Sequence, residues 1–280
     1  MSRAPLELVE IRGPSALGGG WRRARDLLYL IAVGEFRRSY LGTVLGYLWS
    51  FARPLMLFGV LLLVFTQAFD LGERVQQYPL LLLFNIVLFG FFQEATTLAV
   101  NSIVAQEPVV RRTQFPRLVI PLAVVLTCLF NLAANLVVVF GFILVGGVDP
   151  MWTWALLPVV VAGLTVLTTS VSMIVSALNP RFRDTGIIWT VAVTALFYAT
   201  PVLYPLEIVP GTIGRLLALN PLAPLFELAR KWVIDPSAPG PAAAAGGAEW
   251  LIVPAAIALA VCVVAVWVFN REAPRIAEEL

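Results

Sequence analysis

The chain has 280 residues, of which 60% are hydrophobic and only 13% are charged, and its formal net charge is +2. A soluble domain carries about a quarter charged residues, so this composition indicates a protein of the lipid bilayer and gives no support to a nucleic-acid partner. The chain has no histidine and so lacks the commonest general base and metal ligand; we expect no catalytic residue, no metal site and no cofactor.

The N-terminal part, residues 1–42, is expected to be a cytoplasmic segment that precedes a transmembrane domain over residues 43–280. Its first residues include charged side chains and a glycine triplet where a secretory signal needs an apolar stretch, so we expect no cleaved signal. Within residues 21–41, apolar side chains such as Trp21 and Leu28 recur at helical spacing. This pattern predicts an amphipathic helix along the inner leaflet, with a loose basic leader as the alternative.

Six apolar segments are long enough to cross a hydrocarbon core of about 30 Å, which takes about 20 helical residues. At that depth each backbone polar group must bond within its own segment, which favours helices. We therefore expect an all-α integral membrane protein with about six transmembrane helices. They are placed near residues 47–69, 79–103, 118–146, 152–177, 186–205 and 250–270.

The stretch between the fifth and sixth expected spans has a different character. Residues 210–235 contain two short apolar stretches around Asn220-Pro221 and Ala223-Pro224. They are too short to cross the membrane and predict a pair of short re-entrant or interfacial helices on the outer face. Residues 236–248 are rich in Pro, Ala and Gly and predict a flexible loop.

Orientation follows from the basic residues, since cytoplasmic loops carry the excess of Arg and Lys. Most of the 19 basic residues lie on one side if both termini are inside. We therefore expect a multi-pass protein of the cell membrane (the inner or plasma membrane) with both termini in the cytoplasm.

The chain lacks the motif of a nucleotide-binding P-loop, which ends in Gly-Lys-Ser or Gly-Lys-Thr. Its single lysine, Lys231, lies between Arg230 and Trp232. If ATP drives transport, a separate polypeptide must bind the nucleotide.

Several motifs occur in a fixed order along the chain. They are Leu41-Gly42-Thr43-Val44-Leu45-Gly46-Tyr47-Leu48-Trp49 followed by Arg53-Pro54-Leu55, then Phe115-Pro116-Arg117, and later residues 179–184 followed by Thr200-Pro201-Val202-Leu203-Tyr204. In order, spacing and topology these motifs resemble the ABC-2 type permeases that export polysaccharides, O antigens and teichoic acids. The likeness extends over nearly the whole chain.

The resemblance implies a homodimer of this chain joined to two copies of a separate ATP-binding ABC subunit. Such an assembly exports a lipid-linked glycan from the cytoplasmic side outward, and this chain is then a transport subunit rather than an enzyme. It also implies that residues 105–117 carry the coupling helix that docks on the ATPase. The expected contacts are Arg111, Arg112, Phe115 and Arg117; a bare connector between spans is the alternative.

Three arginines near the inner membrane boundary are candidates for binding the substrate headgroup: Arg37, Arg38 and Arg53. Guanidinium groups match phosphate oxygens bidentately, and a lipid pyrophosphate is the headgroup that such an exporter accepts. Ordinary anchoring to anionic lipid is the alternative. Arg53 lies deeper than anchoring requires.

Three further residues are candidates for the translocation path. Glu94 falls inside the second apolar run, where an ionisable group is costly and suggests function. Alternatively it pairs with an arginine of a neighbouring helix and serves the structure. Tyr198 and Tyr204 flank Pro201 and could stack on sugar rings, or they belong to the interfacial aromatic belt.

Three other functions compete with glycan export. One is a drug or lipid exporter permease of the same ABC-2 class. Another is a membrane-embedded enzyme of polyprenyl-phosphate sugar metabolism, which would need clustered carboxylates, whereas the aspartates here are isolated. The third is a secondary transporter, for which we would expect an internal repeat and more charged residues within the membrane spans.

Overall fold

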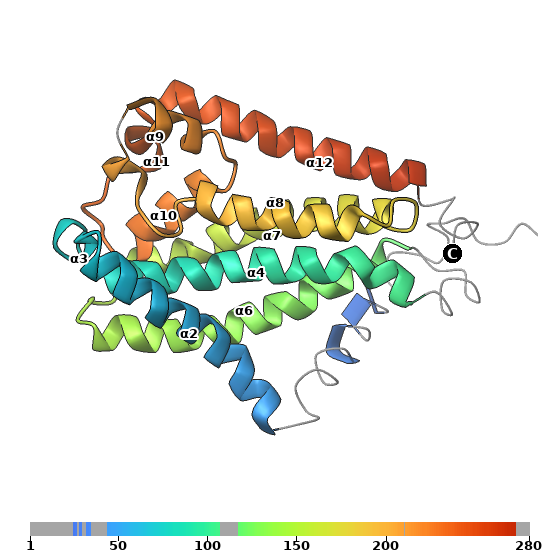
Figure 1. Cartoon of the computed structure of the whole chain (residues 1–280), viewed down its shortest axis with the longest axis horizontal. Coiled ribbons are helices and arrows are strands. Elements are labelled where there is room, and N and C mark those ends of the chain that lie inside the picture. The colour runs from blue at the N-terminus through green and yellow to red at the C-terminus, as the bar shows by residue number, and fades with distance from the viewer. Residues whose placement is uncertain are drawn as a thin grey trace, which may run out of the picture.

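The computed structural model describes residues 25–26, 28–29, 32–34, 44–106, 117–209 and 211–272. Within these residues the secondary structure is helical and no strand occurs. The long helices lie roughly side by side, with the short helices α3, α9, α10 and α11 gathered at one end of the bundle (Figure 1). The described residues between 25 and 34 are helical; the rest of the expected interfacial helix lies outside the described residues.

The long helices are α2 (Val44–Gln67), α4 (Tyr78–Ala105), α6 (Val119–Val145), α7 (Leu157–Leu178) and α12 (Ile252–Glu272). Four helical stretches are long and apolar enough to cross a membrane: Tyr78–Ala105, Val119–Val145, Trp152–Leu178 and Ala248–Glu272. Two further apolar stretches are shorter, namely Phe51–Gln67 and Thr185–Ala199. The expected all-α membrane fold is confirmed.

The fifth expected span, residues 186–205, is shorter than the sequence suggested. Its helix α8 (Thr185–Ala199) has 15 residues, a rise of about 22 Å against a hydrocarbon core of about 30 Å. Thr200 leaves the helix with φ −99° and ψ 146°, the extended conformation favoured before a proline, here Pro201. The C-terminal part of this segment is therefore irregular chain.

Short helices make up the connections: α3 (Leu71–Arg74), η1 (Trp152–Leu156), η2 (Leu206–Ile208), α9 (Gly211–Ala218), α10 (Ala223–Val233), α11 (Pro241–Ala245) and η3 (Ala248–Leu251). The pair α9 and α10 matches the expected short helices. The prediction of a flexible loop over residues 236–248 is wrong in part, because α11 occupies it. Pro241 suits a first helical position, alanines favour helix, and Gly246 ends the helix at φ 89°.

Helix α4 is the centre of the bundle and packs against α2, α6, α7 and α8. Tyr78, Phe84 and Phe89 on this helix are fully buried. Phe89 meets Phe197 of α8 edge to face, with ring centroids 5.2 Å apart, a favoured aromatic geometry. Helix α4 therefore positions the residues of its four neighbours.

Small residues mediate the contact between α7 and α12. Ser172 and Ala177 of α7 and Ala265 of α12 are almost completely buried. Such residues let two helix backbones approach closely in a membrane, where dispersion contacts drive association. The opposite face of α12 carries exposed apolar side chains such as Trp267 and Val263, which suits contact with lipid.

Candidate functional site

Two opposite charges lie on the long helices α2 and α4. Arg53 on α2 and Glu94 on α4 are the only charged residues in the sequences of α2, α4, α6, α7 and α8. Glu94 is half-buried and accepts a hydrogen bond of 3.0 Å from Nδ2 of Asn131 on α6. The hydrogen-bond partner that the structure gives Glu94 is therefore an asparagine of a neighbouring helix.

Arg53 lies deep within its helix. It is about nine residues from Val44, or about 14 Å along the helix axis, and its side chain is exposed in a single copy of the chain. Arg53 is the third residue of the apolar stretch Phe51–Gln67, and an arginine within a membrane span is costly where it meets hydrocarbon. This part of α2 is therefore suited to face protein or water rather than lipid tails.

A row of asparagine side chains continues from Glu94 along α6. Asn135 donates hydrogen bonds to the carbonyl oxygen and Oδ1 of Asn131, at 2.9 and 3.2 Å. Asn135 also lines a small cavity between α2, α4 and α6, whose wall includes Phe51 and Pro54. The polar row therefore leads from the Glu94 carboxylate to the part of α2 that carries Arg53.

The two candidate path tyrosines meet at the end of α8. The hydroxyl of Tyr204 donates a hydrogen bond of 2.6 Å to the carbonyl of Tyr198. Tyr198 is exposed and Tyr204 is half-buried. The Tyr198 ring therefore stands at the surface while Tyr204 helps to close the helix end.

Side chains of α4 donate hydrogen bonds to backbone carbonyl groups of the irregular chain that follows α8. Nδ2 of Asn85 lies 3.1 Å from the carbonyl oxygen of Pro201 and 3.3 Å from that of Val202. The hydroxyl of Tyr78 donates to the carbonyl of Leu203 at 2.9 Å. Non-helical backbone at membrane depth persists where such partners exist, so α4 holds this segment in place.

Asn220, between α9 and α10, makes a third contact to the same helix end. Its Nδ2 donates to the carbonyl of Ala199 at 3.2 Å and to Oγ1 of Thr200 at 2.8 Å. The sequence analysis did not select Tyr78, Asn85 or Asn220 as functional residues. A polar side chain inside an apolar run, as at Asn85, was the available signal, but its partner lies 116 residues away.

A buried ionic cluster joins α10 to the chain after α8. The Arg230 side chain is 4% exposed; its Nη2 lies 2.7 Å from Glu207 Oε1 and 3.7 Å from Asp235 Oδ2. Glu227 is 2% exposed and accepts a hydrogen bond of 2.9 Å from the backbone N–H of Leu206. These contacts fix η2 against α10 at the end of the bundle that holds the short helices.

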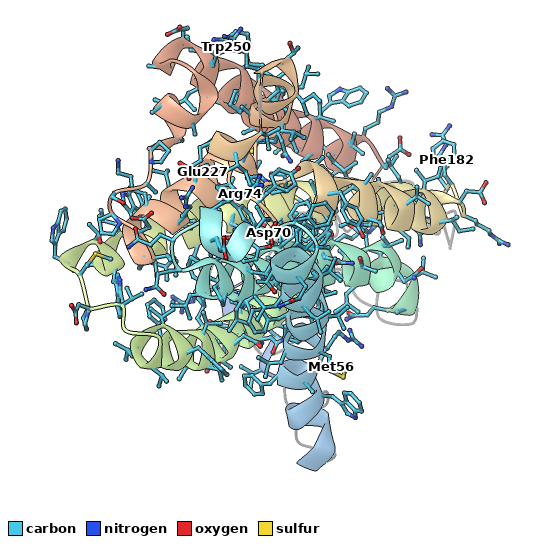
Figure 2. The ribbon with its side chains drawn as sticks, turned by 60° about the vertical axis from the view of Figure 1, so that its left-hand side comes forward. Met56, Asp70, Arg74, Phe182, Glu227 and Trp250 are labelled. Carbon is cyan, nitrogen blue, oxygen red and sulfur yellow. The ribbon has the colours of Figure 1, made fainter. Side chains whose placement is uncertain are left out.

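The electrostatics of Glu227 reflect this burial. Burial raises the pKa of its carboxyl above the ordinary value, and the negative charge of Glu207 acts in the same direction. The hydrogen bond from Leu206 and the charge of Arg230 oppose them. Figure 2 shows Glu227 at the same end as Asp70, Arg74 and Trp250. Within the described residues no three His, Cys, Asp or Glu side chains gather as a metal-ligand set.

The opposite end of the bundle carries the loop between α7 and α8, where Phe182 projects from the surface (Figure 2). Arg181 lies 3.4 Å from Glu272 at the end of α12. Nδ2 of Asn179 donates to Oδ1 of Asn101 on α4 at 3.1 Å. These contacts fasten the loop to two helices and leave the phenyl ring of Phe182 exposed.

Most of the expected coupling and headgroup residues lie outside the described residues: Arg37, Arg38, Arg111, Arg112 and Phe115. Arg117 is described, just before α6; it is half-buried, and burial lowers the pKa of its guanidinium. The start of α6, which Arg117 precedes, lies at the same end of the bundle as the loop between α7 and α8 (Figure 1).

Comparison with known proteins places this architecture among membrane transporters. The family described as ABC-2 type transporter matches residues 26–233. An O-antigen export system permease protein RfbA of Klebsiella pneumoniae is 31% identical over 205 residues, which cover 72% of this chain and 77% of the relative. The protein of the same name in Myxococcus xanthus is 32% identical over 206 residues, covering 72% and 78%.

Proposed function

The chain belongs to the ABC-2 type transporter family, and we propose that it is the permease subunit of an ABC exporter that moves a polysaccharide out of the cytoplasm. The observation that carries the proposal is that O-antigen export permeases align with most of the chain at 31% identity. The multi-pass helical fold supplies the membrane-spanning part of such a machine.

We infer that ATP is hydrolysed on a separate subunit, present in two copies. The chain's single lysine is preceded by Arg230 and not by glycine, so no P-loop can form in it. The connection between α4 and α6, residues 105–117, is proposed to dock on that subunit through Arg111, Arg112, Phe115 and Arg117.

A second copy of this chain is proposed to pack against α2 and α8. Arg53 is exposed at a depth where lipid tails are a costly neighbour, and Met56 on the same helix is exposed (Figure 2). Helix α8 is also largely exposed, with Ile187, Val191 and Tyr198 each more than half accessible. Two copies facing each other through these helices would cover the charge and leave a path between them.

The substrate is proposed to be lipid-linked. A guanidinium can bind two phosphate oxygens in parallel, and Arg53 is exposed on the proposed path. Arg37 and Arg38 are proposed to contribute to the same headgroup site.

The end of the bundle with α3, α9 and α10 is proposed to face outward, with both termini in the cytoplasm of a cell whose inner or plasma membrane holds the protein. The other end holds the start of α6, the loop between α7 and α8 and the last turn of α12 (Figure 1). Arg117 precedes α6, Arg181 and Arg183 lie in that loop, and Arg271 lies in the last turn of α12. That arrangement agrees with the excess of basic residues on the cytoplasmic side of membrane proteins.

Purification of the tagged chain in mild detergent, followed by mass spectrometry, tests the assembly. An ABC-type ATPase should co-purify in stoichiometric amount, and host cells that lack this chain should accumulate the finished glycan on the inner face of the membrane. Normal surface glycan in such cells, together with impaired export of a drug or a simple lipid, would replace glycan export with the competing ABC-2 function.

Charge reversal tests the proposed coupling segment. Replacement of Arg111 and Arg112 by Glu places like charges at the surface that is proposed to receive arginine. The double variant should lose the ATPase subunit or its stimulation by substrate. Arg74→Glu at the opposite end is the matched control and should keep both. Full retention of the ATPase and of export in the double variant contradicts the coupling assignment.

A further inference from the structure

We propose that a polar stripe on α4, formed by Gln93, Thr97 and Asn101, is a hydrogen-bonding track for the sugar hydroxyl groups of the glycan as it crosses the membrane. Thr190 and Thr194 of α8 border this track. The inference rests on the proposed function for the nature of the ligand. It adds α4 to the helices that line the path, and it assigns recognition of the sugar to side chains without charge.

The stripe follows from the helical repeat of α4. Gln93, Thr97 and Asn101 are four residues apart, so their side chains lie along one face, and all three are exposed in a single copy of the chain. The other half of the helix has no such face, because residues 81–89 are buried throughout. The stripe is therefore confined to the half of α4 that ends at Ala105.

The depth of the stripe decides what can cover it. The span Tyr78–Ala105 has 28 residues, which is about 42 Å of helix against a hydrocarbon core of about 30 Å. Gln93 lies close to the midpoint of this span. A side-chain amide or hydroxyl finds no hydrogen-bond partner among lipid tails, and its burial there is costly. The stripe is therefore suited to water or to a ligand that hydrogen-bonds.

Helix α2 covers this side of α4 over one half only. Leu83, Gly90 and Thr97 are seven residues apart and share one side of the helix. Leu83 lines the small cavity whose wall includes Phe51 and Pro54 of α2. A Cβ atom added to Gly90 would meet no other part of the chain within 4 Å. The N-terminal part of α2 diverges from α4 (Figure 1), so the side that carries the stripe is open from Gly90 onward.

Helix α8 places two hydroxyl groups at the edge of this open side. Trp189 packs against a cluster that includes Val175 of α7, which turns the tryptophan toward α7. Thr190 and Thr194 lie on another side of α8 and are exposed. Each donates a hydrogen bond of 2.8 Å to a carbonyl of its own helix, and the lone pairs of its hydroxyl oxygen stay available as acceptors.

The residue types of the stripe suit a ligand rich in hydroxyl groups. The side-chain amide of Gln93 and the hydroxyl of Thr97 can each donate and accept, and neither has a hydrogen-bond partner among the described residues. Sugar hydroxyls also donate and accept, so successive sugar units can exchange partners with the stripe. The net contribution of one such hydrogen bond between neutral groups is modest, which lets a long chain move on.

Reactivity of single cysteines tests what meets the stripe. The host variant lacks Cys128 and Cys262, and the purified complex is placed in lipid nanodiscs. Thr97→Cys should react with a water-soluble methanethiosulfonate reagent, because a thiolate forms in contact with water. Val263→Cys, at an exposed position near the middle of α12, is the matched control for contact with lipid and should not react. An unreactive Thr97→Cys overturns the inference, because lipid or a second copy then covers the stripe.

Protection from the same reagent tests the ligand. The probe is the lipid-linked glycan extracted from host cells that lack this chain, and it should slow the labelling of Thr97→Cys. A polyprenyl pyrophosphate without sugar should leave the labelling rate unchanged. Equal protection by both compounds assigns the stripe to the lipid and overturns the inference, as does the absence of protection by the glycan.

Export by intact cells tests the hydrogen bonds themselves. Thr97→Val keeps the shape of the side chain and removes its hydroxyl, and together with Gln93→Leu it should slow the appearance of surface glycan about tenfold, since two hydrogen bonds to each passing sugar are lost. Thr165→Val on α7 removes a hydroxyl away from the stripe and should export at the normal rate. Unchanged thermal midpoints show that both variants are folded.

Normal export by the double variant overturns the track and leaves the proposed function standing. Normal surface glycan in cells that lack the whole chain, with no glycan accumulated inside, overturns the proposed function and the glycan ligand together. The two failures are thus distinguishable.

Discussion

At Thr200 a single residue decides where the fifth membrane segment ends. Its extended backbone precedes Pro201, and the carbonyl groups released there find donors on other elements. Asn85 supplies two of these hydrogen bonds from one amide group. Individual polar side chains thus permit an irregular backbone where lipid would not.

Asn85→Leu should destabilise the protein by about 1–2 kcal/mol, because two buried carbonyl groups lose their donor. Thermal unfolding of the purified protein in detergent measures the loss. Thr97→Leu, at an exposed position of the same helix, is the matched control and should leave the midpoint within about a degree or two. Equal midpoints for both variants would show that Asn85 does not hold the chain after α8.

The Glu227 carboxyl should make stability depend on pH. Burial raises its pKa in the folded protein, whereas glutamate in an unfolded chain titrates near about 4.3. The stability that the raised pKa of Glu227 contributes to the folded protein is therefore fully present below that value. It is lost as the pH rises through the folded-state pKa. The Arg230 guanidinium lies 3.9 Å from Glu227 Oε2 and also contacts Glu207 and Asp235.

Glu227→Gln keeps an acceptor for the Leu206 N–H and removes the titration. Its midpoint of thermal unfolding should fall less than that of the wild type as the pH rises above the range of an ordinary carboxyl. Glu249→Gln, at an exposed position, should reproduce the wild-type pH profile. Parallel profiles for wild type and Glu227→Gln would contradict the role of this carboxyl.

At the scale of elements, close approach of backbones sets the arrangement of the long helices. Helix α12 packs against α7 through small residues in the half of the bundle that carries the loop between α7 and α8. Helix α8, in contrast, buries little of its surface within one copy. The two helices therefore differ in how they tolerate larger side chains.

Ala265→Leu should destabilise the protein by about 1–3 kcal/mol, since the added volume must separate α7 from α12. Ala260→Leu, on an exposed position of the same helix, adds the same atoms where space is open and should change stability by less than about 0.5 kcal/mol. Denaturation of both variants in detergent compares them. A similar small change in both would mean that α12 can shift without cost.

At the scale of the whole molecule, the two ends of the bundle differ in charge and in architecture. One end carries arginines on short loops, and the other carries the short helices and the ionic cluster around Arg230 (Figures 1 and 2). This polarity matches the proposed orientation, in which the arginine-bearing end faces the cytoplasm.

Single cysteines test the orientation in a variant without Cys128 and Cys262. A cysteine in place of Phe182 should react with a membrane-impermeant reagent only after the membrane is opened. Cysteines in place of Gly72 and Gly240 should react in intact cells, or in spheroplasts where an outer membrane intervenes. Reaction at residue 182 in the unopened samples would reverse the topology.

Much of the architecture was accessible from the sequence because its causes are local. A run of about 20 apolar residues has no stable alternative to a helix in a bilayer, so the expected spans agree with helices such as α4 and α6. Short apolar stretches bounded by prolines likewise predicted the pair α9 and α10. The alanine-rich α11 was missed because the glycines and prolines around it indicated a loop.

The sequence by itself determined the membrane class, the helical fold, the absence of a P-loop and the residues that could carry charge into the bilayer, since each follows from composition or from neighbours along the chain. Only the tertiary structure decided that Asn85 serves the chain after α8 and that Arg230 joins three carboxylates. It also placed Asn131 of α6 against the Glu94 carboxylate. These relations depend on which helix faces lie against each other, and packing between distant segments sets that choice.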